Sequence, residues 1–338
     1  MSVIRDLEAY GPQTRATLPL AEAKAYVRQV TRAHGENFSV VSRLLPRELR
    51  GAFFAVYAFC RWADDLADAP AIVAEPGRGT ELLHWWREEL AMLYAGRPRH
   101  PVFVTLRPVA EKHGLPERLF ADLIDAFVQD QTVARYATWD TLMHYCTRSA
   151  NPVGRLVLMM FGVRDDVSFG LSDATCTALQ LTNFWQDLRR DILERGRIYL
   201  PGEVAEKHGL SLDTLERLTR LDDAARCGAC ALGQGLLSPE AKAQVLPAVQ
   251  AAVADAVGRT RPMFARGREL WPRVKPRFRG QLKLFTLGGE AVLRKIERRG
   301  FDTWTARPRL NRAEKAALVG RVLVGRLVTA GRRGPSGR

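Results

Sequence analysis

The chain has 338 residues, of which 46% are hydrophobic, and a formal net charge of +14. This length and apolar content suffice for a sizeable core, and no apolar run reaches the roughly 18 residues that would indicate a membrane-spanning helix. The chain contains only five cysteines, an odd and sparse count that argues for a reducing compartment. Its first residues show no basic stretch followed by an apolar one, so no secretion signal is expected. We therefore expect a cytoplasmic protein.

The positive charge is concentrated at the C-terminal end. Residues 259–338 contain 22 Lys and Arg against 5 Asp and Glu, whereas the preceding residues contain 29 against 32. A basic region of this kind suits an anionic membrane surface, a polyphosphate substrate or nucleic acid. The alternative is that the charge serves solubility alone.

Apolar residues recur with helical spacing along most of the chain, and alternating apolar and polar runs are almost absent, which predicts an all-α protein. Residues 1–19 are expected to form a loose arm, and Asn151-Pro152 should bend or restart the helix that contains it. Ser172 is the expected N-cap of a later helix. The predicted helices cover residues 20–33, 47–69, 81–93, 101–113, 116–131, 138–161, 172–193, 212–218, 223–236, 239–263, 278–299 and 312–328.

No internal repeat and no Gly/Ser-rich linker divides the sequence, which favours one domain. We predict an N-terminal arm over residues 1–20 and a main domain over residues 21–310. A basic amphipathic helix and a disordered tail should occupy residues 311–338.

The first candidate site is an acidic motif that follows an apolar run. Asp64 and Asp68 are four residues apart, so on a helix they lie on one face with their Cβ atoms about 5–6 Å apart. That spacing suits carboxylates that share hard cations. Asp65 is rotated away from this face, and Arg61 lies one turn before Asp64, within reach of a phosphate. The alternative for the motif by itself is a solvated helix end.

A second motif repeats the pattern far downstream. Asn183, Asp187 and Asp191 are spaced by four residues and form one stripe of a helix, with Gln180 one turn earlier. Oxygen donors on two helices that face one cavity would suit Mg²⁺, with phosphate oxygens completing its coordination. This arrangement indicates ionisation of a diphosphate ester, in which cations neutralise the leaving group.

The carbocation left by such an ionisation requires apolar surroundings that exclude water. Aromatic ring faces can line such a site, because each attracts a cation by about 0.5–2 kcal/mol. Aromatic residues do lie near the motifs in the sequence, although core packing explains each of them equally well. They are Phe38, Phe53, Phe54, Tyr57, Tyr145, Phe184 and Trp185.

Four segments in this order resemble the squalene/phytoene synthase family: residues 57–68, 145–154, 179–191 and 195–201. The resemblance extends from about residue 30 to about residue 305. It implies an all-α isoprenoid synthase fold, with helices around a central apolar cavity, and Mg²⁺-dependent chemistry on C15 or C20 prenyl diphosphates.

The resemblance also implies roles for individual residues. Asp64, Asp68, Asn183, Asp187 and Asp191 correspond to the metal site. Arg61 and Gln180 correspond to diphosphate or substrate contacts, which Phe38, Asn151 and Asn183 are expected to complete. Tyr57 and Tyr145 correspond to the aromatic hydroxyl groups near the reacting carbons.

Departures from the usual family pattern are most similar to the bacterial hydroxysqualene synthase branch of the hopanoid pathway. Gln186 stands where the family usually has Arg, and Asn151-Pro152 replaces Ala-Gly. The branch implies ionisation of presqualene diphosphate, rearrangement and opening of its cyclopropane ring, and capture of the cation by water, with no NADPH. His34, Glu36, Asn37 and Asn151 are candidates to position the water, and their alternative role is capping and loop hydrogen bonding.

Other functions remain open at this point. Presqualene diphosphate synthase, squalene synthase and phytoene synthase, which act on farnesyl or geranylgeranyl diphosphate, are the alternatives within the family. Other hopanoid-pathway enzymes are possible partners. A different class, a basic helical protein that binds membrane or nucleic acid, leaves the two acidic motifs without a role, so we expect no nucleic acid partner. The helix expected over residues 312–328 could contact the inner face of the cytoplasmic membrane or dock on the core.

Overall fold

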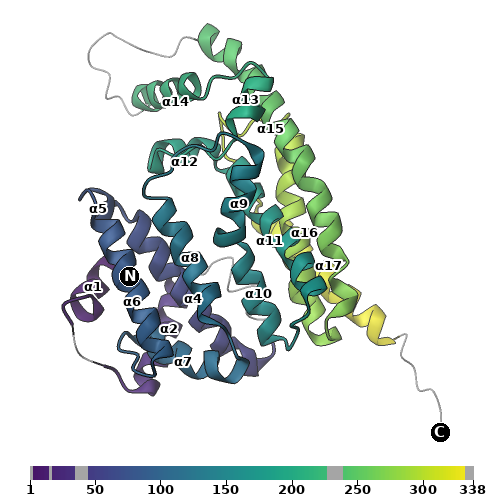
Figure 1. Ribbon diagram of the computed structural model, residues 1–338. Coiled ribbons are helices and arrows are strands. Elements are labelled where there is room, and N and C mark those ends of the chain that lie inside the picture. The colour runs from purple at the N-terminus through teal and green to yellow at the C-terminus, as the bar shows by residue number, and fades with distance from the viewer. Residues whose placement is uncertain (1–2, 15–16, 35–44, 227–238, 332–338) are drawn as a thin grey trace. The chain divides into compact units, whose positions relative to one another are not determined.

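We analysed a computed structural model of the chain, and it describes all residues except 1–2, 15–16, 35–44, 227–238 and 332–338 (Figure 1). The described residues are helical and contain no β-strand beyond one isolated bridge between Arg135 and Ile198. The prediction of an all-α protein is therefore confirmed. None of the helices described is long and apolar enough to cross a membrane.

The chain divides into two compact units, and neither is continuous in sequence. Unit 1 comprises residues 1–132, 147–173 and 272–281, and unit 2 comprises residues 133–146, 174–271 and 282–338. This is no division into consecutive domains, so the predicted partition at residues 20 and 310 stays a prediction. The helices α9 (Trp139–Ser149), α11 (Asp166–Gln186) and α16 (Pro276–Arg298) have residues in both units.

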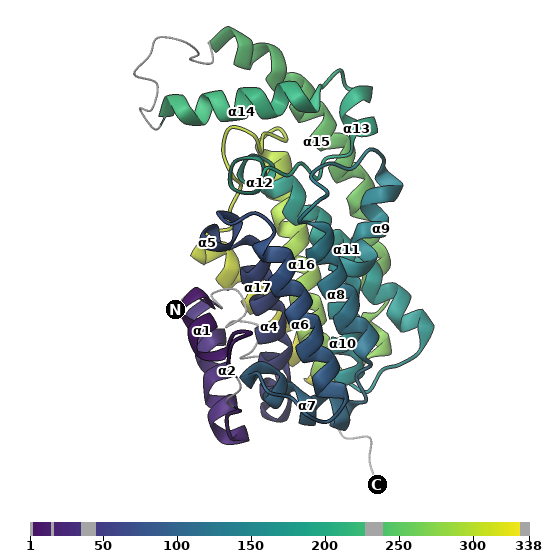
Figure 2. The same cartoon turned by 60° about the vertical axis from the view of Figure 1, so that its left-hand side comes forward.

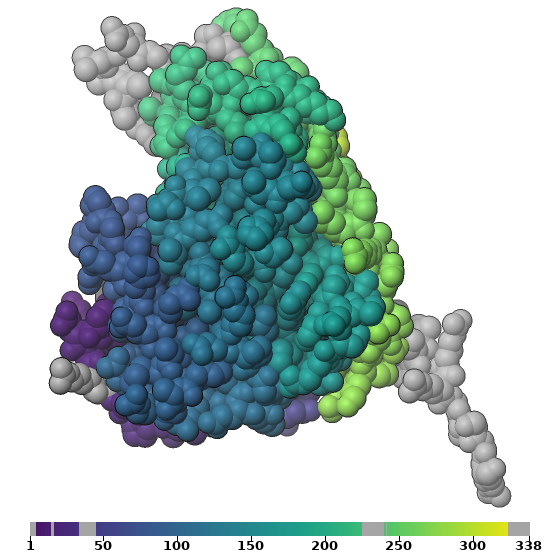
Figure 3. All heavy atoms as spheres, in the orientation of Figure 1, coloured from purple at the N-terminus to yellow at the C-terminus, as the bar shows by residue number. Residues whose placement is uncertain are grey.

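Unit 1 is built around α4 (Arg47–Asp68), which contacts α2, α6, α7 and α8. These helices run beside one another in Figure 2, and the side chains of α6 and α8 meet in one continuous surface in Figure 3. The remaining helices of unit 1 are α1 (Val3–Tyr10), α2 (Leu20–His34), α5 (Pro70–Val73), α6 (Arg78–Tyr94), α7 (Pro101–His113), α8 (Glu117–Gln129) and α10 (Asn151–Met160).

Aromatic side chains fill the core between α4, α6 and α7. The imidazole of His100, which precedes α7, packs edge-on against the rings of Trp62 at 4.4 Å and Trp86 at 4.8 Å. Trp62 and Trp86 also stack on each other at 5.4 Å. Large buried aromatic groups of this kind supply most of the apolar area that holds such helices together.

Unit 2 contains the longest helix, α15, beside α16 (Figures 1 and 2). The indole of Trp185 on α11 donates a 2.9 Å hydrogen bond to Thr260 on α15, deep in the core of this unit. The other helices of unit 2 are α12 (Leu188–Arg195), α13 (Gly202–Lys207), α14 (Leu212–Arg226), α15 (Pro239–Arg268) and α17 (Arg312–Gly331), and a 3₁₀ turn, η1 (Trp271–Arg273), lies at the boundary between the units.

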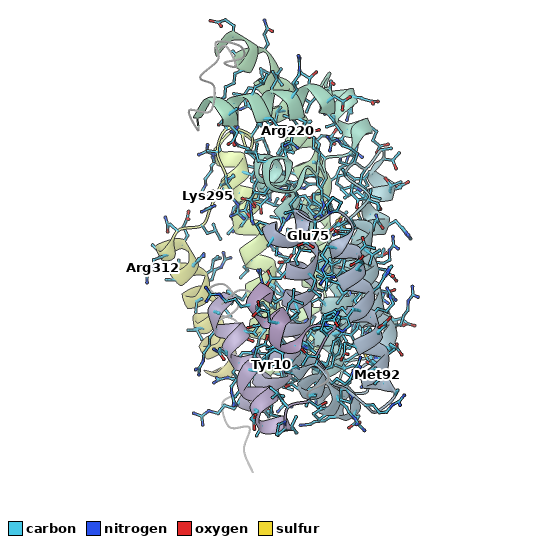
Figure 4. All side chains as sticks on the ribbon, turned by 90° about the vertical axis from the view of Figure 1, so that its left-hand side faces the viewer. Tyr10, Glu75, Met92, Arg220, Lys295 and Arg312 are labelled. Carbon is cyan, nitrogen blue, oxygen red and sulfur yellow. The ribbon has the colours of Figure 1, made fainter. Side chains whose placement is uncertain are left out.

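The expectation of a loose arm over residues 1–19 was wrong, because α1 forms within it. Its residue Asp6 accepts a 2.8 Å hydrogen bond from the Tyr26 hydroxyl on α2. The ring of Tyr10, which is labelled in Figure 4, packs edge-on against the Tyr26 ring with centroids 4.9 Å apart. These tertiary contacts stabilise a helix too short to form by itself.

Several helix boundaries also differ from the prediction, and two of the differences have a clear cause. Residues 212–226 form one helix because the segment contains neither Gly nor Pro. The helix expected to begin at Ser172 begins at Asp166 instead, since the Asp165 carboxylate accepts a 2.9 Å hydrogen bond from the Ser168 N–H and caps it. The expected interruption at Asn151-Pro152 is confirmed, because α9 ends at Ser149 and α10 begins at Asn151.

Candidate functional site: two acidic motifs

The first motif lies on the last turns of α4 in unit 1. Arg61 Nη1 donates to Asp64 Oδ2 at 3.1 Å, and the Arg61 guanidinium also forms a two-point contact with Asp65, with Nε 3.1 Å from Oδ2. The Asp64 side chain is 36% exposed and that of Asp65 only 12%. Asp64 is therefore the more accessible carboxylate, and Asp65 is engaged by the arginine.

Tyr57 lies one turn before Arg61 and is half-buried. Removal from water raises the pKa of its hydroxyl, and the nearby Arg61 charge partly opposes this. The hydroxyl is therefore a proton-bearing group at neutral pH. This suits a hydrogen-bond donor on the same side of the helix as the motif.

The second motif spans a break between α11 and α12 in unit 2, where a continuous helix was predicted. Asp187 has φ −103° and ψ 12°, outside the α-helical range. The hydrogen-bond pattern nevertheless continues, because Asp187 N–H donates to the Asn183 carbonyl at 2.9 Å and Asp191 N–H donates to the Asp187 carbonyl at 2.8 Å. The three side chains thus keep the spacing of one helical stripe.

Arginines hold both carboxylates of this stripe. Arg307 makes a two-point contact with Asp187, with Nη2 2.8 Å from Oδ2, and Arg190 Nη1 lies 3.6 Å from the same oxygen. Arg195 Nη1 donates to Asp191 Oδ1 at 3.0 Å. Burial raises the pKa of Asp191 to about 7, although Arg195 opposes the shift.

Arg307 was missed by the sequence reasoning, and no local pattern could have revealed it, because it lies 120 residues from Asp187. Gln186, which departs from the family pattern, has a role here. Its side-chain amide donates to the carbonyl oxygen of Pro308 and holds the segment that carries Arg307. Nearby, the Trp304 indole donates to Thr219 at 2.7 Å and anchors the same segment.

Four aromatic rings form a cluster that includes Phe184, the residue next to Asn183 of the second motif. Tyr145 lies 6.2 Å from Phe184 and 5.9 Å from Tyr199, and Phe184 stacks on Tyr199 at 3.8 Å. Tyr136 completes the group, 5.3 Å from Tyr145. The sequence singled out Tyr145 and Phe184 but missed Tyr136 and Tyr199. These two residues meet because Ile198 N–H bonds to the Ala134 carbonyl at 2.9 Å.

Each unit holds part of the predicted site. Unit 1 contains Tyr57, Arg61, Asp64, Asp68 and the buried Asn151. Unit 2 contains Tyr145, Gln180, Asn183, Asp187 and Asp191. Among these, Asn183 is exposed and Gln180 is half-buried. The predicted candidates Phe38, Glu36 and Asn37 lie outside the described residues, and the prediction that both motifs serve one cavity stays a prediction.

The donor set of both motifs consists of carboxylates and amides, which are ligands for hard cations such as Mg²⁺. Among the residues that the structure describes, no three His, Cys, Asp or Glu side chains form a group able to hold a metal ion. Asp64, Asp187 and Asp191 are hydrogen-bonded to arginines. A metal would therefore have to compete with these guanidinium groups.

The all-helical fold is that of isoprenoid synthases. The chain is similar to squalene synthase HpnC from Alicyclobacillus acidocaldarius, with a TM-score of 0.69, 40% identity, and coverage of 84% of this chain and 97% of that one. Residues 31–314 match the family model for squalene/phytoene synthase. The chain belongs to the squalene/phytoene synthase family.

Curated relatives agree with this assignment. A hydroxysqualene synthase from Zymomonas mobilis is 38% identical over 184 residues, which cover 54% of this chain and 60% of that protein. A presqualene diphosphate synthase from the same organism is 36% identical over 200 residues, covering 58% and 67%. The aligned region thus spans about 60% of the length of the first of these relatives.

Proposed function

We propose that the protein is an enzyme that converts presqualene diphosphate and water into hydroxysqualene and diphosphate in a Mg²⁺-dependent reaction. The observation that carries the proposal is the stripe of Asn183, Asp187 and Asp191, whose spacing survives the helix break. Similarity to hydroxysqualene synthases supports the choice of substrate.

In the proposed reaction, each motif would hold Mg²⁺ through its oxygen ligands. These are Asp64 and Asp68 in the first motif, and Asn183, Asp187 and Asp191 in the second. When bound, Mg²⁺ would offset the negative charge that develops on the departing diphosphate. Arg61 would orient a diphosphate oxygen, a task for which its planar guanidinium is suited. Gln180 would donate an amide hydrogen bond to the same end of the substrate.

The hydrocarbon part of the substrate would meet the aromatic group of Tyr136, Tyr145, Phe184 and Tyr199. All four are buried, with 3–6% of their surface exposed. Their ring faces would stabilise positive charge on the rearranging carbon skeleton while excluding bulk water. Asn151, which is 7% exposed, is a candidate to hold the one water that captures the cation. That water would lose a proton and leave its oxygen in the alcohol.

The decisive experiment uses the purified full chain with presqualene diphosphate, MgCl₂ and no NADPH, in water enriched with ¹⁸O. We expect a C30 alcohol that carries one ¹⁸O atom. A parallel incubation with farnesyl diphosphate alone is the control. The proposal would be wrong if presqualene diphosphate gave no alcohol while prenyl diphosphates gave presqualene diphosphate, squalene or phytoene.

Presqualene diphosphate synthase activity is the second candidate. It is favoured by the match to two such enzymes, which are 36% and 37% identical over similar lengths. This reaction joins two farnesyl diphosphates and releases one diphosphate. The farnesyl diphosphate incubation distinguishes it, because it yields presqualene diphosphate only if the chain has this activity.

The proposal includes a peripheral contact with an anionic membrane through α17, since the substrate and product are hydrophobic. Leu323 on this helix is 41% exposed, whereas Val322 beside it is 3% exposed. The start of the helix is held by an ion pair of 2.7 Å between Glu314 and Lys295 on α16. Figure 4 labels Lys295 and Arg312, the first residue of α17. An apolar edge flanked by basic residues suits adsorption to a lipid surface.

A further inference from the structure

A cavity of about 410 Å³ lies within unit 1, between α2, the beginning of α4 and the end of α7. Its furthest residue along α4 is Phe54, ten residues before Asp64, which corresponds to about 15 Å along a helix axis. The cavity is thus separate from the acidic motif on the same helix. Its volume falls within the range of small-molecule pockets, about 300–1,000 Å³.

Six of the fourteen lining residues are basic: Lys24, Arg28, Arg47, Arg50, Lys112 and His113. The one carboxylate in the lining, Glu48, lies 3.6 Å from Arg277 and is partly neutralised by it. A concave site with one sign of charge concentrates counter-ions of the opposite sign.

Helix stabilisation explains only part of this charge. Lys112 and His113 lie in the last turn of α7, where basic residues interact favourably with the helix dipole. Arg47 and Arg50 instead lie in the first turn of α4, whose N-cap residue, Pro46, makes no side-chain capping hydrogen bond. Positive side chains are unfavourable at that end of a helix, so a bound anion would stabilise it.

A buried hydroxyl group adds an independent indication of a ligand. Thr105 lines the cavity, is 4% exposed, and its Oγ1 has no hydrogen-bond partner within the described residues. The Oγ1 atom is closed to solvent as placed, so a rotation about χ1 would bring it to a ligand oxygen, and that contact would recover the roughly 1–3 kcal/mol that an unsatisfied buried hydroxyl costs. Burial lowers the pKa of His113, and the neighbouring charges of Lys112 and Arg164 lower it further, as expected in a positive field.

We propose that this cavity binds a phosphate group, held by the basic side chains and the Thr105 hydroxyl. The ligand's carbon portion would lie against the apolar wall of Val27, Phe54 and Val109. The same chemistry is presented by a free phosphate ester and by the headgroup of an anionic phospholipid. The experiment separates these two sources.

The first measurement is titration of the full chain with inorganic phosphate by isothermal calorimetry, in EDTA so that no divalent cation is present. The triple variant Arg28→Gln/Arg47→Gln/Lys112→Gln should bind at least about tenfold more weakly, because charged hydrogen bonds are lost. Thr105→Val, which keeps the charge and shape, should bind about fivefold more weakly.

The matched control, Arg32→Gln/Arg97→Gln/Arg118→Gln, removes the same charge from exposed positions of unit 1 outside the cavity. It should bind phosphate as the unmodified chain does. Equal weakening in the control and pocket variants, or unchanged binding by the pocket triple variant, would overturn the proposal.

The second measurement is co-sedimentation with phosphatidylglycerol vesicles, with phosphatidylcholine vesicles as the reference. If the pocket triple variant binds phosphatidylglycerol at least about fivefold more weakly than the control triple variant, the cavity takes a lipid headgroup. If both variants sediment equally while only the pocket variant loses phosphate binding, the ligand is a soluble phosphate ester.

Discussion

At the scale of single residues, the best-defined titratable group in the core is His100. Its Nδ1 accepts a 3.2 Å hydrogen bond from the Val102 N–H and caps α7, so the proton of the neutral ring lies on Nε2. That nitrogen has no hydrogen-bond partner among the described residues. Burial holds the pKa of His100 well below its ordinary value.

This environment predicts that the protein loses stability in mild acid. Below pH about 6.5 the unfolded chain takes up a proton at this histidine that the folded chain refuses, so unfolding becomes easier by up to about 1.4 kcal/mol per pH unit. His100→Asn, which can still cap the helix, should remove this part of the pH dependence. Urea unfolding between pH 7.5 and 5.5 measures it.

The exposed His84 on α6 provides the control. His84→Asn should leave the pH dependence of unfolding unchanged. If His100→Asn and the unmodified chain lost stability equally between the two pH values, the buried imidazole would not be the group responsible.

The two acidic motifs give a second prediction at this scale. Asp64→Asn and Asp187→Asn each replace a charged oxygen donor with a neutral one of the same shape. Each variant should lower turnover of presqualene diphosphate at least about a hundredfold, because one metal ligand is lost, while far-ultraviolet circular dichroism is unchanged. Glu194→Gln, at an exposed carboxylate beside the second motif, should remain active. Full activity of either aspartate variant would contradict the assignment.

At the scale of elements, the segment between α16 and α17 controls the second motif. Three hydrogen-bonding contacts hold this segment in place. Trp304 donates to Thr219, Arg307 donates to Asp187, and the Pro308 carbonyl accepts from Gln186. The segment therefore supplies a positive charge, that of Arg307, which the partly buried Asp187 carboxylate requires when no metal is bound.

Removing that counter-charge should have an effect that depends on Mg²⁺. Arg307→Gln should destabilise the protein in EDTA by about 1–3 kcal/mol, since it leaves a partly buried carboxylate with only its longer contact to Arg190. Added MgCl₂ should restore much of the loss, because a cation bound at Asp187 replaces the guanidinium. Thermal unfolding with and without Mg²⁺ measures both values.

Arg309→Gln, two residues away at an exposed position, is the control and should change neither value. A loss of stability in Arg307→Gln that Mg²⁺ leaves untouched would indicate that Asp187 does not bind the ion.

Two adjacent glycines on α16 give another matched pair. A Cβ atom at Gly289 would lie 2.4 Å from the Phe264 ring and 2.8 Å from Leu179, whereas one at Gly288 would meet nothing within 4 Å. Gly289→Ala should therefore destabilise the protein by about 1–3 kcal/mol, and Gly288→Ala should stabilise it by about 0.5–1 kcal/mol. Equal effects of the two changes on the unfolding midpoint would contradict this close packing.

At the scale of the whole molecule, the surplus of basic residues in residues 259–338 predicts weak, salt-sensitive adsorption to anionic vesicles. Leu323→Gln should weaken that adsorption about fivefold to tenfold by removing one inserted side chain. Leu20→Gln, at a leucine of the same 41% exposure on α2, should not. Equal effects of the two changes in co-sedimentation would count against α17 as the contact.

Helical periodicity and proline positions predicted most helices of this chain, including α7 with both its ends and the interruption at residue 150. The same reasoning found the acidic motifs, because their spacing is local. It failed where partners are distant in sequence. The helix α1 depends on Tyr26, and Asp187 depends on Arg307. Tyr199 joins the aromatic group because the neighbouring Ile198 N–H donates to the Ala134 carbonyl.

The two backbone hydrogen bonds that link Asn183, Asp187 and Asp191 across the helix break limit how the gene can change. One residue inserted or deleted anywhere between these positions would turn the later oxygen donors by about 100° around the axis. Substitutions at the intervening side chains leave that angle intact. Variation in length should therefore be absent from this stretch, even where other loops of the chain lengthen freely.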